Sequence, residues 1–171
     1  MLVPAITKKQ ELEEAFKNIL YTRKLMYFNG CVENFPHEIK TESDLFNFAI
    51  LSKELELIGY IDFRLNLYDS KVFNFGLIKF CDGYEMTIAS AIIEVIKYIQ
   101  GLRPHKIDFR CVADNPAAFG YIKIMNLFSL QYYTNKITLH DVFKDLVGNY
   151  HDMLIFEFIR KENNNYVYHR N

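Results

Sequence analysis

The period of the apolar side chains changes twice along this chain, and this change limits the fold more than any other feature. From residue 46 to residue 80, runs rich in Phe, Ile, Leu and Tyr are separated by short polar breaks. In the middle run, Tyr60 and Asp62 alternate with Ile61 and Phe63, which is the two-residue period of a strand. These runs predict an antiparallel meander of three strands, 46–53, 55–68 and 71–80.

Segments with helical spacing lie on both sides of the meander. Before it, residues 7–27 place apolar side chains near the helical period, with Thr7 as the expected N-cap. After it, residues 87–100 carry a broad apolar face that ends at Gly101, and Pro104 prevents the helix from resuming. A strand, a second helix and two further strand-like segments follow, at 106–113, 115–125, 129–139 and 151–161. This order predicts one α+β domain over residues 1–161, with a polar tail at 162–171.

Composition excludes several classes of function. The formal net charge of −1, with no cluster of Lys and Arg, argues against a nucleic-acid-binding surface. The three cysteines are widely spaced, which favours reduced thiols over disulfides or a zinc site. Neither a signal peptide nor an apolar run of the roughly 18 residues needed to cross a bilayer is visible. We therefore expect a soluble cytoplasmic protein with no metal and no nucleic-acid or membrane partner.

Three segments carry a resemblance to a known family. The first is the strand 71–80 with the turn and apolar helix that follow it. The second is KIDFRCVADNPAAF (106–119), in which Asn115 opens a helix with Pro116 at its first position. The third is the closing aromatic region, QYY followed by YHDMLIFEF. With the order of elements, the chain resembles the GNAT acyl-CoA N-acetyltransferases over almost its full length. The resemblance implies a three-layer α/β/α fold, with a mixed, mostly antiparallel sheet that splays between the fourth and fifth strands.

The resemblance also implies an activity. Members of this family transfer an acetyl group from acetyl-CoA directly to a primary amine, without a metal. The fourth strand would pair with the pantetheine arm, and the N-terminus of the next helix would bind the diphosphate through free N–H groups and the helix dipole. The expected cofactor-binding residues are Ile78, Lys79, Phe80, Gly83, Tyr84, Glu85, Met86, Thr87, Ala89 and Asn115.

The loop before the first of these helices departs from the family's pattern. That pattern reads Arg or Gln, two residues, Gly, one residue, then Gly or Ala. Tyr84, Thr87 and Ala89 stand at these positions, and only Ala89 matches. Asp82 and Glu85 would oppose a diphosphate, and no positive side chain occupies the loop. The departure supports a second hypothesis, a catalytically impaired GNAT-like module that binds a protein or a metabolite.

Tyr121 is the expected general acid. The family often places a tyrosine in the helix after the fifth strand, where a phenol can protonate the departing CoA thiolate. The usual spacing from the helix-opening Asn is seven residues, which is Ile122, whereas Tyr121 stands six residues after Asn115. Because the chain contains twelve tyrosines, a purely structural role is the equal alternative.

Asp62 is the expected general base, because the amine substrate must lose a proton before it attacks. Asn74 and Glu42 are alternatives by position, and Asp62 as a plain solvent-facing residue is another. His151 and Asp152 are adjacent on a strand and point to opposite faces, so they are interpreted as polar residues at a strand edge.

The acceptor is expected to be a small-molecule amine or a protein amino group. The aromatic C-terminal strands present an edge that invites pairing, which makes a homodimer a further expectation.

Overall fold

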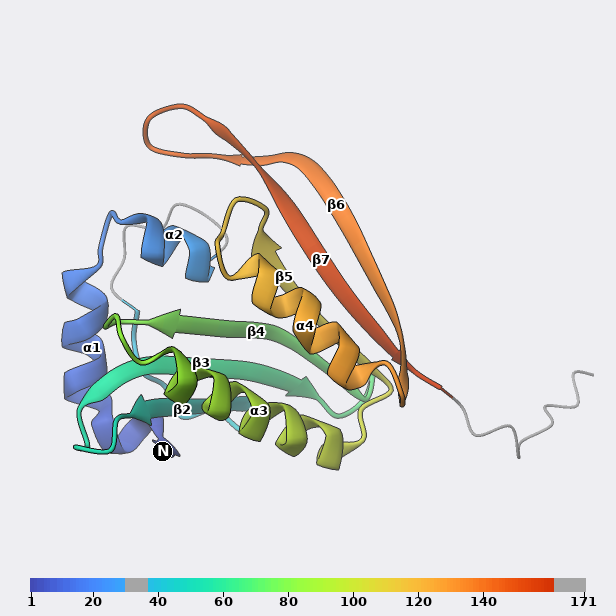
Figure 1. Ribbon diagram of the computed structural model, residues 1–171, viewed down its shortest axis with the longest axis horizontal. Coiled ribbons are helices and arrows are strands. Elements are labelled where there is room, and N and C mark those ends of the chain that lie inside the picture. The colour runs from blue at the N-terminus through green and yellow to red at the C-terminus, as the bar shows by residue number, and fades with distance from the viewer. Residues whose placement is uncertain (30–36, 162–171) are drawn as a thin grey trace, which may run out of the picture.

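The computed structural model describes residues 1–29 and 37–161, and the predicted tail at 162–171 lies outside the described residues. A seven-stranded sheet in the order β1-β2-β3-β4-β5-β7-β6 forms the centre of the molecule (Figure 1). The strands are β1 (Leu2–Pro4), β2 (Leu45–Leu51), β3 (Leu57–Asn66), β4 (Lys71–Lys79), β5 (Lys106–Val112), β6 (Tyr132–Lys144) and β7 (Tyr150–Arg160). The helices are the 3-10 turn η1 (Ala5–Lys8), α1 (Lys9–Asn18), α2 (Arg23–Asn29), α3 (Glu85–Leu102) and α4 (Ala118–Phe128).

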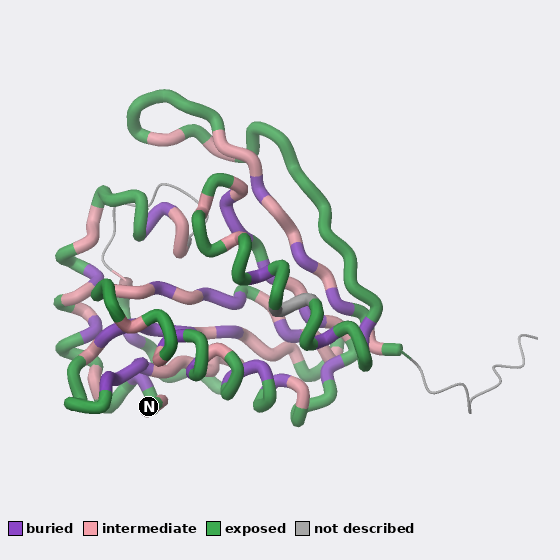
Figure 2. The backbone as a smooth tube through the Cα atoms, in the orientation of Figure 1, coloured by how far each residue is buried: buried purple, intermediate pink, exposed green. Residues whose placement is uncertain are grey.

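Helices cover both faces of the sheet, as the resemblance to the GNAT family implies. Ile61 and Phe63 are fully buried in one cluster with apolar residues of α3, α4 and β5. Tyr60, from the opposite face of the same strand, lies in a second cluster with Leu12 and Phe16 of α1. Figure 1 shows α3 and α4 in front of the sheet, and Figure 2 shows the buried positions along its central strands. The molecule therefore has the expected three layers.

The sheet is mixed and mostly antiparallel, and it splays where expected. β2, β3 and β4 form the predicted antiparallel meander. β4 and β5 run parallel, but they pair only at Lys71–Lys106 and Val72–Ile107. Beyond these two pairs the strands separate. The expected splay between the fourth and fifth strands is confirmed.

The prediction of one continuous helix over residues 7–27 is wrong. Instead of one helix over 7–27, the chain forms η1, α1 and α2, with Tyr21 at a φ of 62° between the last two. A left-handed residue cannot continue a right-handed helix. Thr7 is not the N-cap, because α1 begins at Lys9 and the Thr7 hydroxyl donates to the Pro4 carbonyl at 2.7 Å.

Asn115 caps a turn rather than the helix itself. Its side-chain oxygen accepts a hydrogen bond from the Ala117 N–H at 2.9 Å, and α4 begins at Ala118. Pro116 therefore precedes the helix instead of opening it. The effect of this turn is to bring Asn115 against the separated ends of β4 and β5.

β6 and β7 form a long antiparallel hairpin at the edge of the sheet. Its tip extends past the end of β5 (Figure 1), and β6 is exposed along almost its full length (Figure 2). Among the described residues, no helix has the length and apolar character required to span a membrane.

Candidate active site

A cavity of about 850 Å³ lies beside β4 where β5 has separated from it. Its walls come from α2, β4, α3, α4 and the turn before α4, and they are mostly apolar. The lining residues are Lys24, Tyr27, Leu77, Ile78, Lys79, Glu85, Ile88, Ala89, Ile92, Ile93, Asn115, Pro116, Ala117, Gly120, Tyr121, Lys123 and Leu127.

The edge of β4 supplies hydrogen-bonding groups to this cavity. Within the described residues, β4 and β5 share no paired positions beyond Val72 and Ile107. The backbone N–H and C=O groups on that side of Leu77 and Lys79 therefore lack a strand partner from β5. Such groups need partners, and an extended chain of amides can provide them.

Three lysines surround the cavity, although no positive side chain was expected in the loop before α3. Lys24 comes from α2, Lys79 from β4 and Lys123 from α4. The Lys79 ammonium lies 2.7 Å from Glu85 and 3.2 Å from Asp82. Its hydrogen bond to Glu85 lowers the pKa of that carboxyl and raises the pKa of Lys79. The acids at the start of α3 are thus neutralised by a lysine of the preceding strand.

Asp62 is enclosed on the α1 and α2 face of the sheet. The Tyr60 hydroxyl donates to its carboxylate at 3.1 Å. On the neighbouring strand, Gly76 leaves room for this carboxylate and for the ring of Phe28, since an added Cβ would meet both. Burial raises the pKa of Asp62 to about 7, although the Tyr60 hydroxyl, the Arg64 charge and the Gly76 N–H each lower it. Asp62 is therefore a carboxyl group that can exchange a proton near neutral pH.

The two other base candidates have different surroundings. Glu42 lies 2.7 Å from the Arg64 guanidinium, which Asp44 also binds through both carboxylate oxygens. The Glu42 carboxylate is therefore occupied by its ion pair with Arg64. Asn74 is exposed at a φ of 52°, where the register of β3 and β4 shifts. Asp62 is the candidate with the enclosed environment of a general base.

Tyr121 lines the cavity from α4 and is only 6% exposed. Its ring lies among Phe75, Phe109 and Phe156, with centroid distances of 6.5, 5.0 and 5.9 Å. Burial, followed by the charges of Cys111 and Asp62, raises the pKa of Tyr121 above its ordinary range. Tyr121 is thus a protonated donor in the cavity wall, whereas Asp62 lies on the opposite face of the sheet and is not among the residues that line the cavity.

Solved structures share this architecture. The chain is similar to the ribosomal-protein-S18-alanine N-acetyltransferase of Escherichia coli, at 13% identity, with 97% of each chain covered and a TM-score of 0.63. It is also similar to a probable acetyltransferase of the GNAT family from Chromobacterium violaceum, at 13% identity, with 93% and 85% covered and a TM-score of 0.61. The chain has the GNAT fold.

A third similar structure is the spermidine/spermine N-acetyltransferase SpeG of Vibrio cholerae, at 18% identity with a TM-score of 0.52. That match covers 69% of this chain and 66% of the SpeG chain, just under two thirds of the enzyme's length. No protein-family model and no curated protein sequence matches the chain.

In this GNAT fold, half of the expected cofactor-binding residues line the cavity. They are Ile78, Lys79, Glu85, Ala89 and Asn115. Phe80, Gly83 and Tyr84 are not among its lining residues. Gly83 lies in the turn before α3, where its φ of 88° suits glycine. Asn115 and Tyr121, which are distant from β4 in sequence, line the same cavity as residues of β4.

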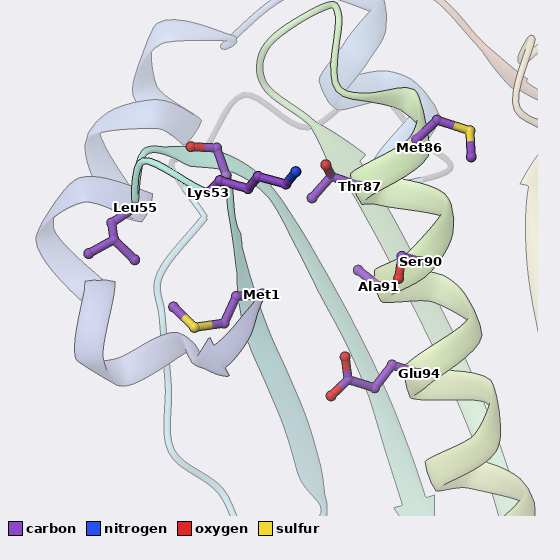
Figure 3. A pocket seen from close by; sticks show the side chains of 9 residues that line it. Met1, Lys53, Leu55, Met86, Thr87, Ser90, Ala91 and Glu94 are labelled. Carbon is purple, nitrogen blue, oxygen red and sulfur yellow. The ribbon is translucent and has the colours of Figure 1, made fainter.

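The side chains of Met86 and Thr87 line a different cavity. That second cavity has a volume of about 550 Å³ and lies on another side of α3. Each residue turns about 100° around a helix, so Glu85, Ile88 and Ala89 face the first cavity while Thr87 does not. Figure 3 shows Thr87 pointing from α3 toward Lys53.

Sequence reasoning missed Lys24, Lys123 and Phe28. Lys24 donates to the Phe80 carbonyl at 3.4 Å, across more than fifty residues of sequence. No local pattern marks such a residue, since it reaches the site only through the packing of α2 on the sheet. Lys123, by contrast, could have been found from the sequence, because it lies on the same helix as Tyr121, two residues later.

Proposed function

We propose that this chain is an N-acetyltransferase that uses acetyl-CoA as co-substrate and acetylates a primary amine by direct transfer. One observation carries the proposal. An enclosed carboxyl with a pKa of about 7, Asp62, and a buried phenol of the cavity wall, Tyr121, lie on opposite faces of the sheet, and the charge of Asp62 contributes to the raised pKa of Tyr121. The GNAT fold and the cavity along β4 support the same reaction.

Asp62 is the general base in this proposal. An amine enters as an ammonium ion, and it must lose a proton before its nitrogen can attack a thioester. With a pKa of about 7, Asp62 is partly ionised at neutral pH and can accept that proton. Tyr60 and Gly76 hold the carboxylate in place through their O–H and N–H groups.

Tyr121 is the general acid. Acetyl-CoA supplies the acetyl group as a thioester, and the new nitrogen–carbon bond forms as the carbon–sulfur bond breaks. Tyr121 stays protonated at neutral pH and is one of the residues that line the cavity. It can therefore donate its proton to the leaving sulfur, which balances the proton that Asp62 removed from the amine.

The residues around the cavity fit the cofactor. The free edge of β4 suits the amides of the pantetheine arm, and the apolar walls suit its methylene groups. Lys24, Lys79 and Lys123 can neutralise phosphate charge near the start of α3. For Lys79 this requires that its contact with Glu85 opens, because a carboxylate and a phosphate compete for the same ammonium.

That ion pair favours a second candidate function. If Glu85 keeps Lys79, the positive end of α3 faces a carboxylate instead of a diphosphate, and the fold would serve as a GNAT-like binding module. Titration of acetyl-CoA into the purified protein by calorimetry separates the two functions. The enzyme requires saturable binding, and no heat up to high-micromolar acetyl-CoA would leave only the binding module.

A blocked cavity tests the location of binding. Gly120 lines the cavity with open space where a side chain would project, so Gly120→Leu should fill it without a clash. We expect the affinity for acetyl-CoA to fall at least about tenfold, a loss of roughly 1.4 kcal/mol or more. Gly101→Leu is the matched control, because Gly101 is also a helical glycine with open space around it and lies outside the cavity. Equal affinity in both variants would place the cofactor elsewhere.

Tyr121→Phe tests the general acid. The variant keeps the ring among its aromatic neighbours and removes only the hydroxyl, so kcat should fall about 100-fold while acetyl-CoA affinity is retained. Tyr98→Phe, at a half-exposed tyrosine of α3 that does not line the cavity, should leave kcat unchanged. The acceptors to test first are spermidine and a peptide with an N-terminal alanine, the classes named for two similar structures. Unchanged turnover in Tyr121→Phe would exclude the phenol from the reaction.

A further inference from the structure

His151 lies between two carboxylates at the tip of the β6–β7 hairpin. Its Nε2 atom is 3.1 Å from the Asp145 carboxylate, in the turn that joins β6 to β7. Its Nδ1 atom is 3.4 Å from the carboxylate of Asp114, which follows β5. The side chains of His151 and Asp145 are only 10% and 12% exposed. The sequence interpretation of His151 as a plain polar residue at a strand edge misses this enclosure.

The two contacts together favour a charged ring. A neutral imidazole has one N–H group, so its other nitrogen would turn a lone pair toward a carboxylate, whereas an imidazolium donates from both nitrogens. Phe143 stacks on the ring at a centroid distance of 5.2 Å and limits its rotation. The Asp145 carboxylate is itself held by the N–H groups of Val147 and Asn149. Because the carboxylates lie at opposite sides of the ring, they do not converge as metal ligands, in keeping with the absence of metal-binding clusters among described residues.

This arrangement joins the hairpin to the wall of the candidate active site. The paired residues of β5 and β7 end at Val112 and Met153, and the Ala113 N–H adds one bond to the Asp152 carbonyl. Asp114 comes next, and it is followed directly by Asn115, which lines the cavity and caps the turn into α4. The His151 contact is therefore the tie that lies nearest to the cavity along this edge.

We propose that His151 is a positioning residue that, as an imidazolium, ties the β6–β7 hairpin to the turn carrying Asn115 and so fixes the wall of the cofactor cavity. The tie itself is a property of the fold. Only its effect on acetyl-CoA binding and turnover rests on the proposed function.

The tie should depend on pH in a defined direction. The hydrogen bond to Asp145, followed by the charge of Asp114, raises the pKa of His151, and the same hydrogen bond helps to lower the pKa of Asp145 to about 2. A raised histidine pKa stabilises the fold below about pH 6.5, and this stability is lost as the pH rises through the folded value. A lowered carboxyl pKa stabilises the fold above about pH 4. The tie is therefore complete between about pH 4 and 6.5 and weakens in alkali.

His140 offers a matched control in the same hairpin. Its Nδ1 atom lies 2.8 Å from Asp152, which points to the other face of β7 and also accepts the Asp141 N–H. The side chain of His140 is 77% exposed and contacts one carboxylate instead of two. His140→Gln removes a His–Asp pair without touching the turn before α4.

The first experiment uses the protein without ligand. At pH 6, His151→Gln should lower the melting temperature by about 3–8 °C, and the loss should at least halve at pH 9. His151→Arg carries a permanent charge with donors on both sides, so it should keep the tie and show a flat pH dependence. His140→Gln should change little at either pH. Equal losses in His151→Gln and His140→Gln, or a loss that does not depend on pH, would overturn the proposal.

Hydrogen exchange locates the tie. At pH 6, amides in 112–117 and 140–152 should exchange at least about fivefold faster in His151→Gln than in the parent chain. Asp114→Asn should accelerate the same two segments, and the double variant should add nothing further, because both changes break one connection. Faster exchange confined to 140–152 would show that the hairpin does not hold the turn, and would refute the inference.

The last measurement connects the tie to the proposed reaction. The dissociation constant of acetyl-CoA should rise about 3–10-fold in His151→Gln at pH 6, with kcat changed less, and the parent chain should show the same rise between pH 6 and pH 9. Affinities that match the parent at both pH values would exclude the positioning role. Failure of every variant to bind acetyl-CoA would instead refute the enzyme, while the melting and exchange results would still decide the tie.

Discussion

Asp62→Asn should reduce acetyl transfer by about 10²–10⁴-fold in kcat, while the affinity for acetyl-CoA is retained. Asn has nearly the shape of Asp and can still accept the bond from Tyr60, but it cannot take a proton from an ammonium ion. In the parent chain, kcat/KM should rise as the pH passes through about 7, where Asp62 ionises. The residual activity of the variant should lack this rise. A pH series of initial rates for both proteins measures the effect.

The same substitution should stabilise the fold in alkali. Burial raises the pKa of Asp62 to about 7, so the folded state binds this proton more tightly than the unfolded chain does. The stability that the protonated carboxyl contributes is full below about pH 4 and is lost as the pH rises through about 7. Asn stays neutral, and the variant should gain up to roughly 4 kcal/mol over the parent by pH 8. Each kcal/mol corresponds to roughly 2–4 °C in Tm.

Asp69→Asn is the control for both effects, since Asp69 lies in the exposed turn between β3 and β4. It should change neither the rate profile nor the pH dependence of melting. Parent-like turnover by Asp62→Asn would transfer the role of base to another group. Equal melting temperatures of the Asp62→Asn variant and the parent at pH 8 would show that ionisation of the Asp62 carboxyl does not destabilise the fold.

Gly76→Ala should damage both stability and turnover. A Cβ at this position would collide with the Asp62 carboxylate and lie 2.7 Å from the Phe28 ring. Neither neighbour can withdraw easily, because Asp62 is held by Tyr60 and the Phe28 ring packs against Phe16 and Tyr60. We expect a loss of about 1–3 kcal/mol and a melting temperature lower by roughly 3–10 °C.

The displaced carboxylate should also lower kcat at least about tenfold, since a base must be within hydrogen-bond reach of its proton. Gly101→Ala provides the comparison, because that glycine lies exposed in α3 with no atoms near its added Cβ. It should raise stability by up to about 1 kcal/mol through helix propensity alone. A Gly76→Ala protein as stable and active as the parent would mean that the space around Asp62 is not limiting.

The fold could be predicted from sequence because its determinants are local. The two-residue alternation around Tyr60 and Asp62 defines a strand and its two faces, and the apolar face of 87–100 defines a helix. The order of these elements supports the resemblance to the GNAT family, and that resemblance implied the three layers and the splay. The break at Tyr21 was not visible, because helical periodicity continues through a residue whose backbone is left-handed.

The site was predicted only where its residues carry a local signal. Asp62 stands out as an acid that alternates with apolar residues on a strand, and Tyr121 follows the Asn115 turn. Lys24 and Phe28 reach the site through the packing of α2, and Asp114 meets His151 across two strands. The charge balance at the start of α3 was misjudged for the same reason, since Lys79 belongs to the strand and not to the loop.

The splay of β4 and β5 divides the sheet into two pieces that share few backbone hydrogen bonds. One piece is the meander β1–β4 and the other is β5 with the β6–β7 hairpin, and two residue pairs are the only rungs between them among the described residues. The Lys71–Asp108 ion pair and the Phe75–Phe109 ring contact also join the two pieces, and the helices α3 and α4 pack across both. A ligand that bonds to the free edge of β4 and touches α4 would take the place of the hydrogen bonds that β4 and β5 do not form with each other. Part of its binding free energy would therefore serve to couple the two parts of the sheet.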